Sequence, residues 1–211
     1  MKIDKINLAI GIVWLFHVSG IIGMILGYSD WFLPKTPLNL LICILLLIFV
    51  GDLLSFQKAF LALVFFASGM FVEWTGVKYS FPFGEYYYGQ NLGLKLDGVP
   101  YLIGVNWSML VIITGCIASQ VKTSLFLKVL IGAALMVFLD FFIEPNSANF
   151  DFWYWADDHI PLSNYIGWFV IAAGLHWIYQ TYMEQMNFRF CLNLYLSQLV
   201  FFISFYVQAI I

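Results

Sequence analysis

The sequence contains few charged residues. Only 10% of its 211 residues are Asp, Glu, Lys or Arg, whereas 63% are hydrophobic and the mean hydropathy is +0.90. Soluble domains carry about 25% charged residues, so this composition is that of a membrane protein. The net charge is −3, and no cluster of Lys and Arg forms the basic patch that nucleic-acid binding requires. Nucleic acid is therefore excluded as a partner, and we expect the membrane and molecules of the lipid phase instead.

Motifs for cofactors and metals are also missing. The sequence has no GxxxxGK[ST], no GxGxxG after a strand and no HExxH, so nucleotide binding and zinc proteolysis have no support. Cys43, Cys116 and Cys191 lie in separate apolar runs with no Cys or His at metal-ligand spacing, and we expect them to be buried small side chains. The last apolar run lacks the lysine that a retinal Schiff base would need. We therefore expect no metal site and no cofactor.

Long apolar runs are abundant by contrast. A helix that crosses a bilayer needs about 20 mostly apolar residues, and seven windows qualify, the third being the shortest. They cover residues 6–28, 37–55, 58–75, 100–119, 125–143, 163–182 and 188–210. All six prolines fall between these windows or at their edges, as expected if the windows are helices. We predict an all-α integral membrane protein, with a single transmembrane domain over residues 1–211 built as a bundle of about seven helices.

Basic residues near the helix ends indicate the orientation. With the N-terminus in the cytoplasm, that side holds Lys2, Lys5, Lys58, Lys122, Lys128 and Arg189, against Lys35, Lys78 and Lys95 outside. The two long connections, residues 76–99 and 144–162, then both lie on the outer side. Both are rich in aromatic residues, which either form a belt at the lipid headgroups or line a pocket. We predict that they are structured and that this face carries the function.

Three acidic residues occupy positions where a carboxylate is costly. Glu73 closes the third window, and Asp140 and Glu144 close the fifth, four residues apart and so on one helix face. Carboxylates at such depths usually face the protein interior and mark function. A dry setting raises the pKa of a carboxyl group and leaves it a proton to donate near neutral pH. We expect the three to converge on one pocket as catalytic residues, the alternatives being an interfacial role for Glu73 and plain helix termination at Glu144.

Polar and aromatic side chains at similar depth are candidates for contact with a substrate. Asn106 lies in the fourth window at about the depth of Asp140, where an amide either links helices or binds a ligand. His17 and His176 are lone histidines without a neighbouring acid at metal spacing, which favours a packing or hydrogen-bonding role. The candidates for substrate contact are Asn106, Trp107, Trp74, Tyr86, Trp153, Trp155 and His176.

These segments also resemble a known family. The stretches EWTGVKYSFPFGEYYYGQNLGLKLDGVPYLIGVNW (73–107), DFFIEPNSANFDFWYW (140–155) and PLSNYIGW (161–168) are similar to those of the CruF-type carotenoid biosynthesis proteins, known as carotenoid 1,2-hydratases. The similarity is good over residues 73–180 and elsewhere concerns hydropathy alone. It implies cofactor-independent addition of water to the terminal C1–C2 double bond of an acyclic carotenoid end, which gives a tertiary alcohol.

The resemblance also implies partners and a location. The substrate would be a lipid-phase carotenoid, other carotenoid-biosynthesis enzymes are candidate partners, and the protein would lie in a bacterial or archaeal cytoplasmic membrane. Two other functions use the same features. A carotene cyclase begins with the same protonation, and a carrier or transporter of carotenoids or lipids needs the apolar groove without catalysis.

Under the hydratase hypothesis each candidate has a role. The Asp140 carboxyl group protonates the alkene, and Glu73 takes the proton of the attacking water, although the reverse assignment stays open. Glu144 and Asn106 orient the water or adjust the pKa of the acid. The cation that forms needs aromatic faces around it, and the candidates for these are Trp107, Trp153 and Trp155.

Overall fold

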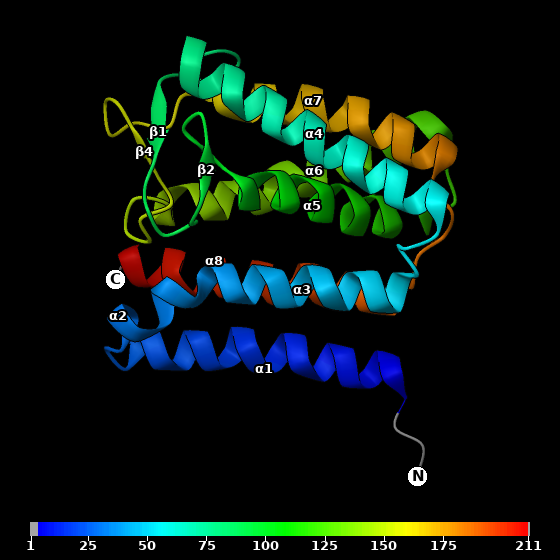
Figure 1. Ribbon diagram of the computed structural model, residues 1–211, viewed down its shortest axis with the longest axis horizontal. Helices are drawn as coiled ribbons and strands as arrows, with labels where there is room; N and C mark the ends of the chain where they lie inside the picture. The colour runs from blue at the N-terminus through cyan, green and yellow to red at the C-terminus, as the bar shows by residue number, and fades with distance from the viewer. Residues whose placement is uncertain (1–3, 211) are drawn as a thin grey trace.

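Seven long helices make up most of the part of the chain that the structure describes. The computed structural model describes residues 4–210, with side chains described through residue 207, so Lys2 lies outside the described residues. The helices lie side by side along one direction, with the two ends of the chain at opposite ends of the bundle (Figure 1). Their bounds are α1 Lys5–Ile25, α3 Thr36–Gly51, α4 Phe56–Tyr79, α5 Tyr101–Ser119, α6 Leu125–Ile143, α7 Leu162–Tyr182 and α8 Phe188–Ile210. The predicted helical bundle is confirmed.

Short helical segments complete the chain. A four-residue helix, α2 (Ser29–Phe32), and a 3₁₀ turn, η1 (Leu33–Lys35), lead from α1 into α3. A second 3₁₀ turn, η2 (Glu144–Asn146), extends α6. Because η2 continues the helix, Glu144 stays on the same helical path as Asp140 instead of entering a loop.

The predicted windows match the helices to within three residues at each end, apart from the second and the third. The second window, residues 37–55, runs four residues past the end of α3 at Gly51. The sequence predicts the third window to be the shortest, and this is wrong, because α4 has 24 residues and is the longest of the seven long helices. It continues through Glu73 and Lys78 to Tyr79 before Ser80 adopts a left-handed backbone conformation with φ of 55°. Charged side chains lower the hydropathy of this last part without interrupting the backbone hydrogen bonds of a helix.

Six segments of the described chain are long and apolar enough to cross a membrane, as expected of an integral membrane protein. They are Lys5–Ile25, Ser29–Gly51, Phe56–Tyr79, Tyr101–Ser119, Leu125–Asn146 and Phe188–Val207. Helix α7 has a similar length but is less apolar, since it carries Asn164, His176 and Gln180. The first two of these side chains are buried, and α7 makes its most extensive contact with α6. The polarity of α7 therefore faces the interior of the bundle.

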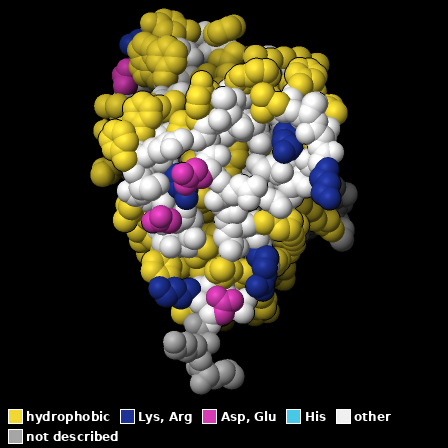
Figure 2. All heavy atoms as spheres, turned by 90° about the vertical axis from the view of Figure 1, so that its right-hand side faces the viewer, with side chains coloured by type: hydrophobic (Ala, Val, Ile, Leu, Met, Phe, Trp, Pro, Cys, Tyr) yellow, Lys and Arg dark blue, Asp and Glu magenta, His cyan; other side chains and the backbone are white. Residues whose placement is uncertain are grey.

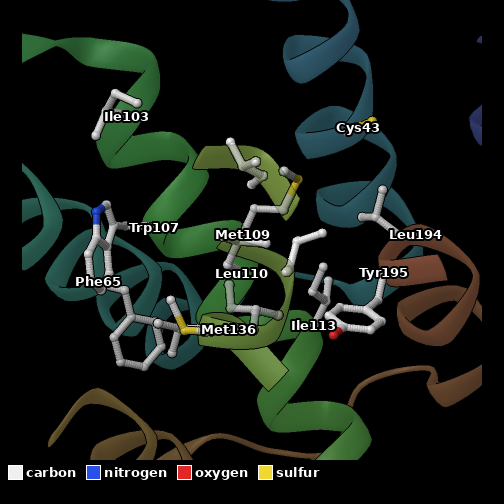
Figure 3. Close-up of a cluster of buried hydrophobic side chains, with 14 of the residues drawn as sticks. Cys43, Phe65, Ile103, Trp107, Met109, Leu110, Ile113, Met136, Leu194 and Tyr195 are labelled. Atoms are coloured by element: carbon white, nitrogen blue, oxygen red, sulfur yellow. The ribbon is translucent and has the colours of Figure 1, made fainter. Parts of the chain in front are cut away.

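Helix α5 forms the centre of the bundle. Of its apolar window 72% is buried, compared with 39% or less for the other five apolar segments, and it packs on α3, α4, α6, α7 and α8. Figure 3 shows side chains of α5 meeting those of its neighbours in this core; those labelled are Cys43, Phe65, Ile103, Trp107, Met109, Leu110, Ile113, Met136, Leu194 and Tyr195. Residues carried by α5 are thus held from all sides.

The two long connections fold together as a cap at the end of the bundle opposite the N-terminus (Figure 1). Their strands are β1 Tyr86–Tyr88, β2 Lys95–Leu96, β3 Val99–Pro100 and β4 Trp153–Trp155. The two-stranded sheets are both antiparallel, and one pairs β1 with β4 across about 65 residues of sequence, while the other pairs β2 with β3. The prediction that both connections are structured is confirmed.

The register of the β1–β4 pair sorts its aromatic side chains by face. Tyr86 lies opposite Trp155, and Tyr88 lies opposite Trp153. Because side chains alternate along a strand, Tyr86 and Tyr88 are buried while Tyr87 between them is 59% exposed. One face of this small sheet therefore points into the bundle.

Basic side chains lie at both ends of the bundle, and more of them lie at the end where the chain begins. Figure 2 views the end where the chain begins, and Lys, Arg and some acidic side chains gather there between apolar flanks. The described basic residues of the helix ends and turns on this side are Lys5, Lys58, Lys122, Lys128 and Arg189, and those on the cap side are Lys35, Lys78 and Lys95. Which end faces the cytoplasm stays a prediction.

Close packing of α4 on α5 gives a first test. A Cβ atom at Gly69 would lie 2.5 Å from the Cβ of Trp107. Overpacking of this kind costs about 1–3 kcal/mol, more than the roughly 1 kcal/mol that alanine gains over glycine in a helix. We expect Gly69→Ala to lower the melting temperature of the detergent-solubilised protein, followed by circular dichroism.

Gly174→Ala in α7 is the matched control, because no atom lies within 4 Å of the added Cβ. This variant should melt at the wild-type temperature or above it. Equal melting temperatures for the two variants would argue against the close contact between α4 and α5.

Candidate active site

Three carboxyl groups from two helices meet beneath the cap. Glu73 comes from α4, Asp140 from α6 and Glu144 from η2, and their residues are 3%, 1% and 4% exposed. They line one cavity of about 20 Å³, which we call the carboxylate chamber. Its lining consists of Glu73, Phe83, Tyr86, Tyr88, Ile103, Asn106, Trp107, Asp140, Ile143, Glu144, Trp153, Trp155, Asn164 and Trp168. The structure thus brings together the three acids that the sequence singles out.

Glu73 is surrounded by hydrogen-bond donors. The hydroxyl groups of Tyr86 and Tyr88 donate to its Oε2 at 2.5 and 2.7 Å, and the indole N–H of Trp107 donates to its Oε1 at 2.8 Å. Hydrogen bonds to an ionised acceptor are among the strong ones. These three groups therefore take the place of water around a carboxylate.

The two tyrosines are well suited to remain donors. Burial raises the pKa of Tyr86 and of Tyr88 well above the usual range, and the neighbouring Glu73 carboxylate adds to the effect. Both hydroxyl groups accordingly keep their protons near neutral pH and above.

Glu144 has a donor set of the same size. The indole N–H groups of Trp153 and Trp155 donate to its Oε2 at 3.0 and 2.8 Å, and the Asn164 side-chain amide donates to its Oε1 at 2.8 Å. The two tryptophans come from β4, and Asn164 comes from the first turn of α7. Two separate segments, β4 and α7, must therefore be in place before this carboxyl group is solvated by protein.

Asp140 is different from the other two acids. Its Oδ2 accepts one hydrogen bond, from the Asn164 amide at 3.2 Å, and its buried Oδ1 has no hydrogen-bond partner among the described residues. A buried polar atom without a partner costs about 1–3 kcal/mol. Of the three acids, Asp140 is the one with an oxygen still open to a further partner.

Cations do not neutralise the chamber within the described part of the chain. The ion pairs found over residues 4–210 join Lys58 to Glu184 and Lys78 to Asp97, and none of these residues lines the chamber. Its carboxyl groups are therefore balanced by hydrogen bonds alone.

Aromatic rings form much of the chamber wall. Trp107 stacks on Trp168 of α7, with ring centroids 4.1 Å apart and planes 20° from parallel, while Phe83 packs against Tyr86 and Trp168. Such faces attract a positive charge. The chamber thus combines carboxyl groups with aromatic walls in a buried space.

Asn106 lies at the edge of this chamber. Its side chain is half-buried and forms no hydrogen bond with another described residue, so it does not link two helices as the alternative role would require. An amide in this state can donate to a bound water or ligand and accept from it.

Two predicted site residues lie elsewhere. The indole of Trp74 donates to Asp97 Oδ2 at 2.6 Å, and this bond, together with the Lys78 ammonium group, lowers the pKa of Asp97 on the cap surface. The His176 ring lies 2.8 Å from the Ala172 carbonyl oxygen and 2.8 Å from the Thr114 hydroxyl group, which joins α7 to α5. Neither Trp74 nor His176 lines the chamber.

Several chamber residues are not among those predicted from the sequence. Asn164 is a buried amide at the start of an apolar window, which is the same signal that identifies Asn106. Tyr88 shares a strand face with Tyr86 and could be found once β1 is recognised. Phe83 and Trp168 are ordinary aromatic residues without a distinguishing signal in the sequence.

Comparison with known protein families gives a match over most of the chain. Residues 36–211 match the model of a family described as "Carotenoid biosynthesis protein". No curated protein and no solved structure matches the chain. The matched range includes every residue that lines the chamber.

A double-mutant cycle tests the hydrogen bond between Tyr88 and Glu73. Removal of one hydroxyl in Tyr88→Phe should cost about 1.5–3 kcal/mol, the value for a bond to a charged group. The same change in a Glu73→Gln background should cost less, because the acceptor no longer carries charge. Thermal unfolding of the four proteins in detergent gives this difference. Equal losses in both backgrounds would contradict a direct bond, and Tyr87→Phe on the exposed face is the control.

Proposed function

Because the chain belongs to the carotenoid biosynthesis protein family, we propose that it hydrates carotenoids. In this proposal water adds across the terminal C1–C2 double bond of an acyclic end and leaves a tertiary alcohol. The observation that carries it is the open Oδ1 of Asp140 in a chamber of about 20 Å³. A buried water needs a space of roughly 10–15 Å³, so the chamber has the capacity for one water beside this oxygen.

The first step is protonation of the alkene. Addition of a proton to the less substituted carbon, C2, leaves a tertiary cation at C1. We assign Asp140 as the acid, because it receives one hydrogen bond whereas Glu73 and Glu144 each receive three. Among neighbouring acids without a cation, like charges repel. The proton is then best held by the carboxyl group with the fewest donors, and its open oxygen can deliver it.

The second step is stabilisation of the cation. The stacked rings of Trp107 and Trp168, together with the walls of Trp153 and Trp155, offer π faces at the chamber. The fixed charges of the hydrogen-bonded glutamates add electrostatic stabilisation that needs no reorganisation during the reaction.

The third step is capture by water. One water attacks C1, oriented by Asn106 and Glu144, and Glu73 takes the proton that this water loses. Return of that proton to Asp140 restores the starting state, so the net change is the addition of one water to the carotenoid. The scheme involves no electron transfer.

Expression in a bacterial host that accumulates acyclic and monocyclic carotenes tests the function. We expect the wild-type chain to give a product heavier by the mass of one water, measured by chromatography and mass spectrometry, with the new oxygen derived from labelled water in isolated membranes. Asp140→Asn should reduce product by at least a hundredfold, because general acid catalysis contributes about 10²–10⁴. Asp97→Asn, at an exposed carboxylate, should leave conversion unchanged.

Other outcomes identify the competing functions. An isomer of unchanged mass would indicate a cyclase, and binding of carotene without any product would indicate a carrier. Full hydration by Asp140→Asn would overturn the assignment of the acid.

Deuterium labelling separates the acid from the base. In heavy water, Glu73→Gln should still protonate the alkene but capture water poorly, so the cation returns to alkene and the recovered substrate carries deuterium at C2. Asp140→Asn should give neither product nor label. The opposite pattern, with label in Asp140→Asn alone, would exchange the two roles.

A further inference from the structure

A second and larger cavity borders the carboxylate chamber. It has a volume of about 320 Å³ and lies between α1, α3 and α8, with α2, η1 and part of the cap closing it. We call it the α1–α3–α8 groove. Its size is at the lower end of the roughly 300–1,000 Å³ typical of small-molecule sites, and most of its lining takes no part in the chemistry proposed above.

The lining of the groove suits a neutral apolar ligand. Aromatic rings make up much of it, contributed by Phe16, Trp31, Phe150, Phe152, Phe201 and Phe202. Lys35 is the charged residue among the lining residues, and it is already engaged, since its ammonium group donates to the Trp31 carbonyl oxygen and lies 3.4 Å from the centroid of the Trp31 ring. Apart from this ammonium group, the lining offers no counter-charge for a ligand with a charged head.

The groove and the chamber share part of their walls. Ile103, Asn106, Ile143 and Trp153 line both cavities. Through Trp153, which also donates its N–H to Glu144, the apolar space is in contact with the acidic one. A ligand that fills the groove therefore has one end at the boundary of the carboxylate chamber.

We propose that the α1–α3–α8 groove binds the polyene chain of an acyclic carotenoid, with the terminal double bond at the shared wall. The direction of the ligand rests on the proposed function, whereas its place in the groove does not. On α1 the lining runs from Phe16 to Met24, about 12 Å at 1.5 Å per residue. A carotene is longer than this, so the remainder extends into the bilayer and the enzyme acts on one end at a time.

Filling the groove from opposite walls tests the proposal. Leu40 and Leu41 are adjacent on α3, but Leu40 lines the groove whereas Leu41 is 45% exposed and does not. Gly20 and Gly11 are both on α1, where a Cβ at Gly20 meets the Phe201 ring at 3.3 Å and a Cβ at Gly11 meets nothing within 4 Å. The matched pairs are Leu40→Trp with Leu41→Trp, and Gly20→Leu with Gly11→Leu.

Binding is measured separately from catalysis. An achiral acyclic carotene shows circular dichroism in the visible region when it binds in a chiral site, and this signal is titrated with protein in lipid nanodiscs. We expect saturable binding by the wild type and by Asp140→Asn. Leu40→Trp and Gly20→Leu should bind about tenfold more weakly or worse, equivalent to the loss of roughly two buried methylene contacts. Leu41→Trp and Gly11→Leu should bind like the wild type.

The outcomes distinguish this proposal from the proposed function. Saturable binding that is lost in both groove-filling variants supports the groove even if no hydration is detected. Hydration by the wild type combined with full binding by both groove-filling variants, shown to be folded by their helical circular dichroism, would overturn the groove and leave the hydratase intact. Absence of an induced signal in the wild type, with phospholipid retained in the groove instead, would also overturn it.

Discussion

The structure depends on one electrostatic constraint, namely that carboxyl groups buried in an apolar helical bundle must be solvated by protein. Glu73 and Glu144 each accept three hydrogen bonds. Four of these six donors belong to β1 and β4, so the cap is part of the interior solvation of the bundle. Unsolvated carboxylates at this depth would be strongly destabilising, which links the folding of the cap to the closure of the site.

The same constraint explains the choice of aromatic donors. Tyr and Trp combine a large apolar body with a single O–H or N–H, so each can supply one hydrogen bond to a carboxyl group without bringing water along. On β1 and β4 the side chains alternate, and Tyr86, Tyr88, Trp153 and Trp155 reach inward. The aromatic richness of these connections thus serves the interior, not the lipid headgroups alone. It also leaves π faces around the chamber.

The sequence predicts those features of the structure that depend on local patterns, and it does not predict contacts between distant segments. Hydropathy and proline positions locate the helices, and the rarity of carboxylates in apolar surroundings identifies Glu73, Asp140 and Glu144. The β1–β4 pairing is a contact between segments about 65 residues apart, so no local pattern reveals that Tyr88 and Trp153 meet. Trp74 and His176 share the residue types of the site, but rotation around α4 and distance along α7 direct them to Asp97 and Thr114.

The two adjoining cavities meet different requirements of the proposed reaction. A lipid-soluble substrate needs an extended apolar surface, which the groove of about 320 Å³ offers, whereas water must be admitted sparingly. The chamber of about 20 Å³ has room for one water but not for a ring. In a cyclase the chain must fold back so that an internal double bond reaches the cation, which demands a wide space at the acid. A chamber this narrow admits a water but no folded-back chain, so the carotenoid end would stay extended at the wall shared with the groove, which is the reason for preferring hydration over cyclisation.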